Sequence, residues 1–170
     1  MPAAATFTVK PFSAVYRRAV ANLVLDIQRR EFNIPVTLEA QPDLVDIAGF
    51  FRKGAGDFWV ALAGRTPVGT IGLLDIGEGR GCLRKMFVHA TWRGREKGVA
   101  QELLDTLLRH AANHGIGEIL LGTIDKFVAA QRFYRRNGFV EIPESELPAA
   151  FPRMHVDTNF FRRRGPAAAV

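Results

Sequence analysis

Apolar positions near the start of the chain repeat with the spacing of a helix. Over residues 12–27 they recur at i, i+3, i+4 and i+7, which predicts a helix that buries one face. Ser13 stands at the start of this segment and is expected to be its N-cap. A weaker helical stretch covers residues 44–52, after a Pro42-Asp43 pair that is typical of a helix start. The connection at 31–41 shows little periodicity, and a connection of this length in a compact domain often carries function.

The next segments are short and rich in β-branched and aromatic residues. Residues 58–62 and 68–74 have this composition and are separated by Gly-Arg-Thr-Pro, which predicts a β-hairpin. Residues 75–81 contain three glycines and are predicted to form the following turn. A third strand is expected at 82–88, so that three antiparallel strands result.

The spacing changes again in the second half of the chain. Residues 99–111 carry apolar side chains on one helix face, and Gly115 follows at the usual left-handed position of a helix end. Strands predicted at 82–88 and 119–123 flank this helix, and the two strands of such a unit should be parallel. The remaining elements are predicted as a helix at 127–136, a strand at 139–142, a proline-bounded loop at 143–152 and a last strand at 154–160.

Length and composition point to one domain. The chain has 170 residues, of which 48% belong to the hydrophobic set and 24% are charged, as is typical of a single soluble globular domain. We assign the domain to residues 1–161 and expect 162–170 to be a disordered basic tail. The lone cysteine, Cys82, excludes an internal disulfide and indicates a reducing compartment. Since neither a signal peptide nor a membrane span is recognisable, we expect a cytoplasmic protein with no membrane partner. One cysteine cannot form a thiolate metal cluster, and we expect no metal site.

The charge balance is basic. Lys and Arg number 23 against 17 Asp and Glu, which gives a net charge of +6 and a sequence pI near 10.1, so nucleic acid has to be considered as a partner. Eighteen of the 23 cations are arginines, whose planar fork of donors suits phosphate or carboxylate. Three arginines stand together at 162–164, and without them the net charge is +3. Because no recognition helix or aromatic stacking motif accompanies the charge, we expect no nucleic-acid partner.

The segment Arg93-Gly94-Arg95-Glu96-Lys97-Gly98-Val99-Ala100 lies between a predicted strand and the long helix. The first N–H groups of a helix have no intrahelical partner and lie at the positive end of its dipole, so a glycine-containing turn here can hold a phosphate or pyrophosphate. Gly98 and the small Ala100 let the backbone approach the anion. The glycine spacing matches neither a P-loop nor a dinucleotide fingerprint.

Residues 95–100 fit the pattern Q/R-x-x-G-x-G/A and resemble the acetyl-CoA-dependent GCN5-related N-acetyltransferases (GNAT). A second block, 130–139, resembles the A-x-x-x-Y-x-x-x-G-F segment of that family at the expected distance, and the resemblance covers about residues 59–142. It implies an α/β (α+β) fold with a central mixed, mostly antiparallel sheet of about six or seven strands flanked by about four helices. It also implies acetyl-CoA as cofactor, bound in part by Arg93, Arg95, Glu96, Lys97, Gly98, Val99 and Ala100.

The resemblance assigns roles to the strand before the phosphate loop and to one tyrosine. In the family this strand carries a bulge whose backbone groups pair with pantetheine, and Met86, Phe87 and Val88 occupy that place. Three large apolar residues in succession also break the alternation of a half-buried strand. A backbone N–H near Val88 would stabilise the oxyanion, and Tyr134 would be the general acid that protonates the leaving sulfur.

The second block is implied to contact the cofactor through Ala130 and Phe133. The family commonly has an asparagine seven residues before the tyrosine, where this chain has Phe127. The corresponding polar contact to the pantetheine arm is therefore missing, or it is made by Asp125 or Lys126.

The acceptor amine has to lose its proton before it can attack, so a base is needed. The candidates are Glu31, Asp75, Glu141 and, through water, His89. By analogy with the family, the loop that contains Glu31 and Phe32 and the segment 151–157 would border the acceptor, and Asp75 is a third candidate for contact with it. Arg153 and Asp157 could bind a carboxylate or an amine of the acceptor.

Two functions are weighed against each other. The first is an enzyme that transfers acetyl from acetyl-CoA to a primary amine of a small molecule or peptide by direct attack. The alternative is a non-catalytic acyl-CoA-binding regulatory module of the same fold. The identity of the acceptor and the presence of a homodimer stay open.

Overall fold

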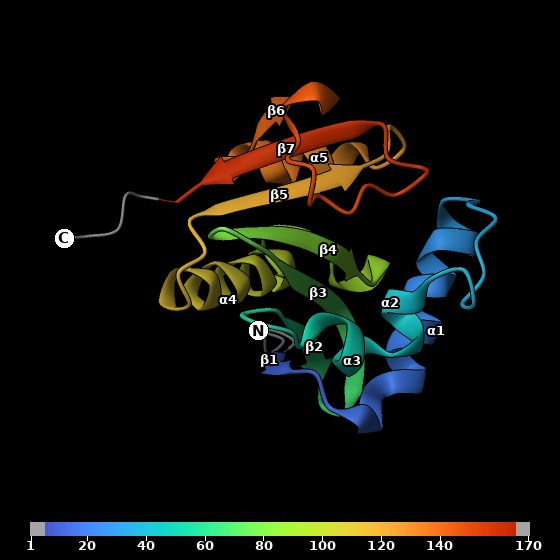
Figure 1. Ribbon diagram of the computed structural model, residues 1–170. Coiled ribbons are helices and arrows are strands. Elements are labelled where there is room, and N and C mark those ends of the chain that lie inside the picture. The colour runs from blue at the N-terminus through green and yellow to red at the C-terminus, as the bar shows by residue number, and fades with distance from the viewer. Residues whose placement is uncertain (1–5, 166–170) are drawn as a thin grey trace.

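The computed structural model describes residues 6–165, which form a seven-stranded sheet with helices on both faces (Figure 1). The strands are β1 (Thr8–Pro11), β2 (Asp57–Ala63), β3 (Thr66–Gly77), β4 (Arg80–Val88), β5 (Glu118–Thr123), β6 (Val140–Ile142) and β7 (Asn159–Arg164). Their order in the sheet is β1-β2-β3-β4-β5-β7-β6. All neighbours are antiparallel except β4 and β5, which are parallel. The predicted fold class, the hairpin and the parallel pair around the long helix are thus confirmed.

Helices α4 (Val99–Asn113) and α5 (Val128–Arg136) cover one face of the sheet. The apolar stripe of α4 places Leu103, Leu104 and Leu107 in the largest core cluster, where each is fully buried. Tyr134 of α5 is buried in the same cluster. The long helix predicted from periodicity therefore begins and ends within two residues of the expected positions.

The first third of the chain covers the other face. It comprises α1 (Arg17–Asp26), α2 (Pro42–Val45) and α3 (Ile47–Phe51), which bury a separate cluster against β2. Along β2, Trp59 and Ala61 point into the core under α4, whereas Phe58 and Val60 point to this second core. Because β2 is apolar on both sides, the sheet is the middle layer of three.

The N-terminal helices differ from the predicted ones in detail. The segment expected as one helix over 12–27 is a short 3-10 turn, then α1, and then a π-helical turn, Ile27–Glu31. Ser13 is the N-cap residue of the 3-10 turn, but its side chain makes no capping hydrogen bond, and the N-cap of α1 itself is Tyr16. The helix predicted at 44–52 is divided at Asp46, whose carboxylate instead accepts a hydrogen bond from the Gly49 N–H at 3.0 Å and caps α3.

The turn and strand limits of the middle segment also need correction. β3 continues to Gly77 and β4 begins at Arg80, so the turn predicted over 75–81 comprises only two residues, both in left-handed backbone. The antiparallel edge strand β1 lies in a stretch for which we predicted no strand.

The C-terminal strand lies later than predicted. β7 covers Asn159–Arg164 and lies between β5 and β6, whereas the prediction placed the last strand at 154–160. The assignment of 162–164 to a disordered tail is therefore wrong, and the domain extends at least through them. Arg162 pairs with Glu146 at 3.4 Å and Arg164 with Glu118 at 3.1 Å, so these charges have partners on neighbouring segments. Residues 166–170 of the expected tail lie outside the described residues.

β4 and β5 pair over only three residues and then separate. The pairing runs from Arg80↔Glu118 to Cys82↔Leu120, although both strands continue beyond it, and Figure 1 shows them diverging. The edge of β4 that faces β5 therefore carries backbone N–H and C=O groups without a strand partner. This opening is the structural basis of the site.

A β-bulge lies in β4 beside this opening. Between Arg84 and Phe87 the ladder to β3 gains one residue, so that Lys85 and Met86 together oppose a single residue of β3. Lys85 is the residue with left-handed backbone, at φ +53°. The bulge expected at 86–88 exists, but it consists of Lys85 and Met86 and so begins one residue earlier.

Candidate active site

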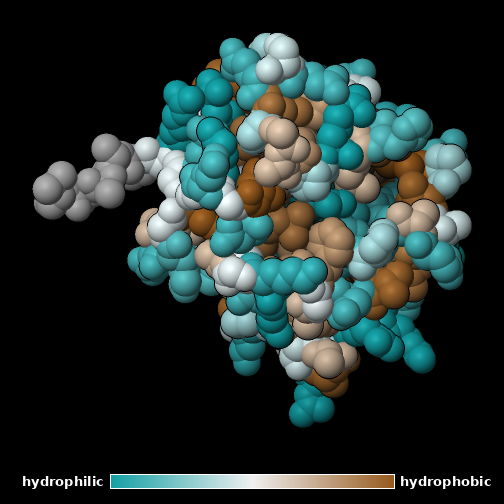
Figure 2. Space-filling view, in the orientation of Figure 1, coloured by the Kyte–Doolittle hydropathy of each residue, from teal (hydrophilic) through white to brown (hydrophobic). Residues whose placement is uncertain are grey.

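A cavity of about 1120 Å³ fills the space between the diverging ends of β4 and β5. Its walls come from β4, from the β4–α4 loop with the start of α4, from α5, from the 27–41 segment and from the 151–157 loop. On the face seen in Figure 2, apolar residues gather over the centre, where β4 and β5 lie in Figure 1, and hydrophilic residues surround them. Segments distant in sequence thus meet in one partly open cleft.

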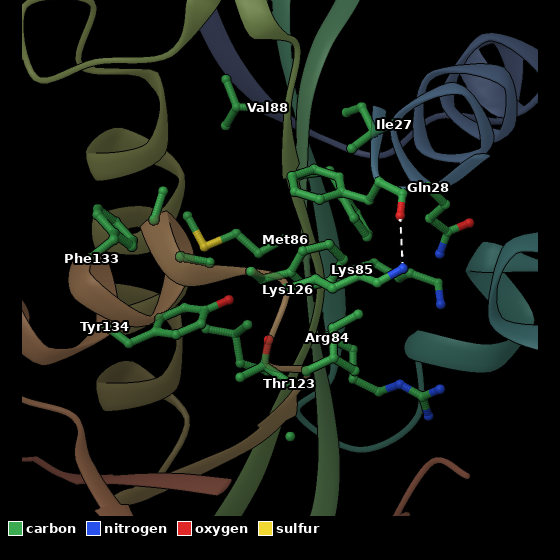
Figure 3. Close-up of a pocket in the computed structure, with 18 of the residues that line it drawn as sticks. Ile27, Gln28, Arg84, Lys85, Met86, Val88, Thr123, Lys126, Phe133 and Tyr134 are labelled. Carbon is green, nitrogen blue, oxygen red and sulfur yellow. Dashed lines mark hydrogen bonds between the residues drawn. The ribbon is translucent and has the colours of Figure 1, made fainter. Parts of the chain in front are cut away.

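Tyr134 projects from α5 into this cleft. Figure 3 shows its hydroxyl pointing into the cavity toward β4, between Met86 and Thr123. The ring packs against Phe139 and Phe161, with centroid distances of 5.6 and 6.1 Å, and the residue is 5% exposed. Burial raises the pKa of the phenol well above its usual value, so the hydroxyl keeps its proton at neutral pH.

One end of the cleft is formed by the start of α4. Gly98 is the N-cap residue in left-handed backbone at φ +74°, and a Cβ built there would meet nothing within 4 Å. The first N–H groups of α4 have no intrahelical partner, and the helix dipole adds about half a positive charge at this point. Arg95 and Arg136 line the cavity on the same side. These groups make this end of the cleft electropositive.

Most of the residues predicted to bind cofactor line the cavity. They are Met86, Phe87, Val88, Arg93, Arg95, Gly98, Ala100, Ala130 and Phe133. Three others do not. Val99 is fully buried in the core under α4, the ammonium of Lys97 lies 5.9 Å over the Trp92 ring, and Glu96 folds back toward Gly94. The side chains of Glu96, Lys97 and Val99 therefore support the loop without lining the cavity.

Glu31 lies beside the cleft as the partner of a cation. Its carboxylate accepts hydrogen bonds from both terminal nitrogens of Arg93, with Nη2···Oε2 at 2.8 Å, while Arg93 Nε donates to the Val88 carbonyl at 2.8 Å. Glu31 lines a smaller neighbouring cavity and not the main one. The structure therefore gives Glu31 the role of orienting Arg93 and does not bring it to the acceptor.

Aromatic side chains form one wall of the cleft. Phe127 stands edge-on to Phe32 at 4.7 Å and to Phe87 at 6.2 Å, and all three line the cavity. Lys126 Nζ donates to the Phe32 carbonyl at 3.2 Å and thereby ties the 27–41 segment to the start of α5 (Figure 3). The position where the family commonly has asparagine thus contributes to an apolar wall in this chain. Phe32, expected by analogy with the family to border the acceptor, lines the same cavity.

A group of buried charged side chains lies at the end of the cleft opposite the start of α4. Arg84 and Lys85, both in the cavity wall, each place a nitrogen 3.1 Å from one carboxylate oxygen of Asp43. The side chain of Arg84 is 13% exposed, that of Lys85 is 5% exposed and that of Asp43 is 1% exposed. Burial lowers the pKa of the Lys85 ammonium group. The nearby Asp43 carboxylate opposes this shift because it stabilises the charged form.

Asp157 is the one carboxylate that lines the main cavity among residues 6–165. Its Oδ2 accepts a hydrogen bond from the Met154 N–H at 2.9 Å, and burial raises its pKa. A Cβ at residue 122 would overlap this carboxylate, so Gly122 of β5 makes the room that Asp157 occupies. A carboxylate with a raised pKa inside a cleft is a recognised type of functional group.

Three candidate bases from the sequence lie elsewhere. The Asp75 carboxylate accepts hydrogen bonds from the Ala55 and Gly77 N–H groups, both at 2.9 Å, which lower its pKa and hold the loop before β2. Glu141 is held by Arg135 and Asn159, and His89 bonds to Thr91. Neither Asp75, Glu141 nor His89 lines the main cavity, so the expected contact of Asp75 with the acceptor is not supported.

Sequence reasoning missed the Asp43, Arg84 and Lys85 group. The Pro42-Asp43 pair predicts a helix start, and Asp43 does lie in the first turn of α2, yet its carboxylate is a buried counter-ion. The signal was present in β4, where two consecutive cations interrupt an otherwise apolar strand. Charged residues are almost never fully buried unless they are paired, which calls for a partner or a ligand.

Cys82 should be unreactive in the folded protein. The thiol is 1% exposed, and burial raises its pKa to about 12, so almost no thiolate is present at neutral pH. We expect native protein to react with Ellman's reagent at less than about a tenth of a thiol per chain within minutes, and at one thiol per chain in denaturant. Rapid reaction of the native protein would contradict the described burial.

Comparisons with known proteins were made against this geometry. The family model described as the acetyltransferase (GNAT) family matches residues 21–139. Among curated proteins, N-acetyltransferase 8B of Rattus norvegicus is 32% identical over 101 residues, 57% of this chain and 46% of that protein. N-acetylaspartate synthetase of Danio rerio is 30% identical over 127 residues, 72% of this chain and 44% of that protein. The chain therefore spans about half the length of these curated relatives.

Solved structures give the same result over nearly the whole chain. A GNAT-family acetyltransferase from Staphylococcus aureus Mu50 is 36% identical, with a TM-score of 0.89, and the match covers 94% of this chain and 99% of that one. An acetyltransferase from Streptococcus agalactiae 2603 is 23% identical with a TM-score of 0.88, and the match covers 93% of this chain and 98% of that one, which is evidence for the fold alone. With the family model matching most of the described residues, this chain belongs to the acetyltransferase (GNAT) family.

Proposed function

We propose that the chain is an acetyl-CoA-dependent N-acetyltransferase that acts on a primary amine. The observation that carries the proposal is one continuous cavity that contains the unpaired edge of β4, the start of α4 and the Tyr134 hydroxyl. An extended arm can add to a free strand edge, and a pyrophosphate can bind a helix N-terminus, so the features of the cleft match the parts of an acyl-CoA.

The described residues fit this cofactor in their charges. Six cationic side chains line the cavity against one carboxylate, which is an unusual excess for an otherwise apolar cleft. In the proposal, the N–H groups of Val99 and Ala100, with Arg95 and Arg136 beside them, hold the pyrophosphate. The backbone of 86–88 pairs with the pantetheine arm, and Ala130 and Phe133 pack against it.

Acetyl-CoA supplies a thioester, and attack by the amine nitrogen on its carbonyl carbon forms the C–N bond as the C–S bond breaks. Tyr134 gives its proton to the departing sulfur. A phenol of pKa about 10 protonating a thiolate of pKa about 8.5 works uphill by roughly 2 kcal/mol, and burial of Tyr134 increases that cost. A catalytic step can include such a cost because the proton moves as negative charge develops on the sulfur.

The attacking amine also has to be neutral. An alkylamine of pKa about 10.4 is deprotonated about once in 2,500 molecules at pH 7, a penalty of roughly 4.6 kcal/mol. Asp157 is placed to receive this proton, because it lines the cavity and its raised pKa makes it a better base than an exposed aspartate. In this proposal Asp157 takes the role of base for which the sequence offered Glu31, Asp75, Glu141 and His89, none of which lines the cavity.

The experiment combines binding with turnover. Titration calorimetry with acetyl-CoA tests the cofactor, and release of free CoA thiol over a panel of amines tests transfer. The buried Cys82 contributes no background to this assay. Thiol release that depends on an amine supports the proposal. Tight binding without release for every amine would favour the alternative, a non-catalytic acyl-CoA-binding module.

Location in a reducing compartment, expected from the lone cysteine, is part of the same proposal. Within residues 6–165, no helix combines the length and apolar character that crossing a membrane requires.

A further inference from the structure

The end of the cleft opposite α4 holds positive charge that the proposed phosphate contacts do not use. Arg84 and Lys85 line the cavity along β4 on the far side of Met86 from Val88 and the phosphate loop. Figure 3 places both side chains on the α2 side of β4, across the cleft from Tyr134. A cofactor whose phosphates lie at Gly98 leaves these two cations to the acceptor.

The direct ion pairing of this charge involves a single carboxylate. Arg84 and Lys85 share one oxygen of Asp43, and Asp157, whose carboxylate charge also acts on both cations, makes no ion pair with either among the described residues. The guanidinium is incompletely satisfied, because among residues 6–165 Arg84 Nε is buried with no hydrogen-bond partner and Nη2 has, besides Asp43, only the weak acceptor sulfur of Met154 at 3.0 Å. Buried polar groups without partners are rare and call for an explanation.

Hydrogen bonds and the bulge fix the backbone at Lys85 and the segment beside the two cations. Lys85 sits in the left-handed residue of the bulge, and its carbonyl accepts the Thr70 hydroxyl at 2.7 Å. Beside them, Gln28 and Gln41 exchange two side-chain hydrogen bonds, at 2.9 and 3.0 Å, which fix the π-helical turn against the 32–41 segment. Both glutamines line the cavity. Cations held in this way are suited to recognise an anion of fixed position.

We infer that the acceptor amine carries a carboxylate, as an amino acid does, and that Arg84, with Lys85 beside it, binds this carboxylate at the end of the cleft opposite the start of α4. This inference rests on the proposed function, since it specifies the acceptor of that reaction. The acceptor carboxylate supplies the strong hydrogen-bond acceptor that the Arg84 guanidinium lacks. Its amine then extends from Arg84 along the cleft toward Tyr134.

Matched ligands test the inference on the unmodified protein. The chain is saturated with CoA, which cannot transfer an acetyl group, and the binding of two ligand pairs is measured by calorimetry. Phenylalanine against phenylalaninamide tests an α-carboxylate, and glutamate against glutamine tests a side-chain carboxylate. Since charge-assisted hydrogen bonds are about twice as strong as neutral ones, we expect the carboxylate of at least one pair to bind tenfold or more tightly than its amide. Equal affinity within both pairs, or no binding by any of the four, would overturn the inference.

Variants then assign the effect to a residue. Arg84→Gln removes one cation and leaves Lys85 paired with Asp43, so the tenfold preference should fall to near one while acetyl-CoA binding stays unchanged. Arg109→Gln is the control, because Arg109 pairs with Glu102 along α4 outside the cavity lining, and there the preference should persist. A preference that survives in Arg84→Gln would contradict the role of this residue. If that variant does not fold, the ligand pairs on the unmodified chain still decide the question.

The two proposals fail in different ways. Absence of thiol release with every amine would defeat the proposed transferase and leave the carboxylate preference measurable on the CoA-bound chain. Thiol release that is equally efficient for amino acids and for their amides would retain the transferase and remove the carboxylate site.

Discussion

Replacing Tyr134 with phenylalanine is expected to lower kcat for acetyl transfer about a hundredfold or more and to leave the Kd for acetyl-CoA within about twofold. The substitution removes one oxygen from a buried ring that packs on Phe139 and Phe161, so the fold should be retained. The departing sulfur would then leave as an unprotonated thiolate. Steady-state kinetics by thiol release, with calorimetry for acetyl-CoA, measures both quantities.

The chain provides a matched control for this variant. Tyr16 is the other of the two tyrosines and packs against the core on the opposite side of the sheet, away from the cavity lining. Tyr16→Phe removes the same atom and should leave kcat unchanged. An equal loss of kcat in both variants, or no loss in Tyr134→Phe, would remove Tyr134 from the role of general acid.

The pH profile gives an independent reading of the same residue. Burial raises the Tyr134 pKa, so the phenol stays protonated further into the alkaline range than an exposed tyrosine would. Deprotonation of Tyr134 should therefore cause no fall in kcat as the pH rises toward 10. An acidic limb is expected as the base gains a proton, and the raised pKa of Asp157 moves that limb to higher pH than for an ordinary aspartate.

Replacing Gly98 with alanine is expected to weaken acetyl-CoA binding about tenfold or more. The new methyl group enters the open space at the start of α4, where the proposal places the pyrophosphate, and it also strains a backbone at φ +74°. Strain alone costs about 1 kcal/mol of folding free energy. Calorimetry with CoA measures the affinity, and thermal unfolding measures the strain.

Gly115→Ala separates these two effects. Gly115 follows the other end of α4, at φ +78°, and it too has nothing within 4 Å of a built Cβ. Both variants should lose similar stability, while only Gly98→Ala should lose affinity for CoA. Equal affinities in the two variants would contradict the placement of the pyrophosphate at the start of α4.

The spacing of apolar residues within single segments predicted several helices and strands of this fold. The helix at 99–113 and the strands at 57–63 and 66–77 follow from spacing that each segment carries within itself. The glycine-containing turn at the start of α4 was located in the same way, whereas Tyr134 was singled out by the resemblance of residues 130–139 to a family motif. These features needed no knowledge of distant partners.

Features that depend on distant partners were missed or misplaced. The arginines at 162–164 resemble a solvated tail, yet Arg164 is paired with Glu118, 46 residues away, and Arg162 pairs with Glu146. Asp43 is likewise matched to cations more than forty residues later in the chain. The spacing of apolar residues along the chain does not indicate which charged side chains form ion pairs in the fold. The buried charges at the proposed acceptor end of the cleft could therefore be identified only from the three-dimensional structure.

The central claim is that acetyl moves directly from acetyl-CoA to an amine in the cleft between β4 and β5. The most direct measurement follows an isotopic label in the acetyl group of acetyl-CoA, with the chain and the amine panel present, by mass spectrometry of the products. We predict label in an amide of one amine class, one equivalent of free CoA for each amide, and loss of both in Tyr134→Phe. Label that stays in acetyl-CoA for every amine, although acetyl-CoA binds, would contradict the claim.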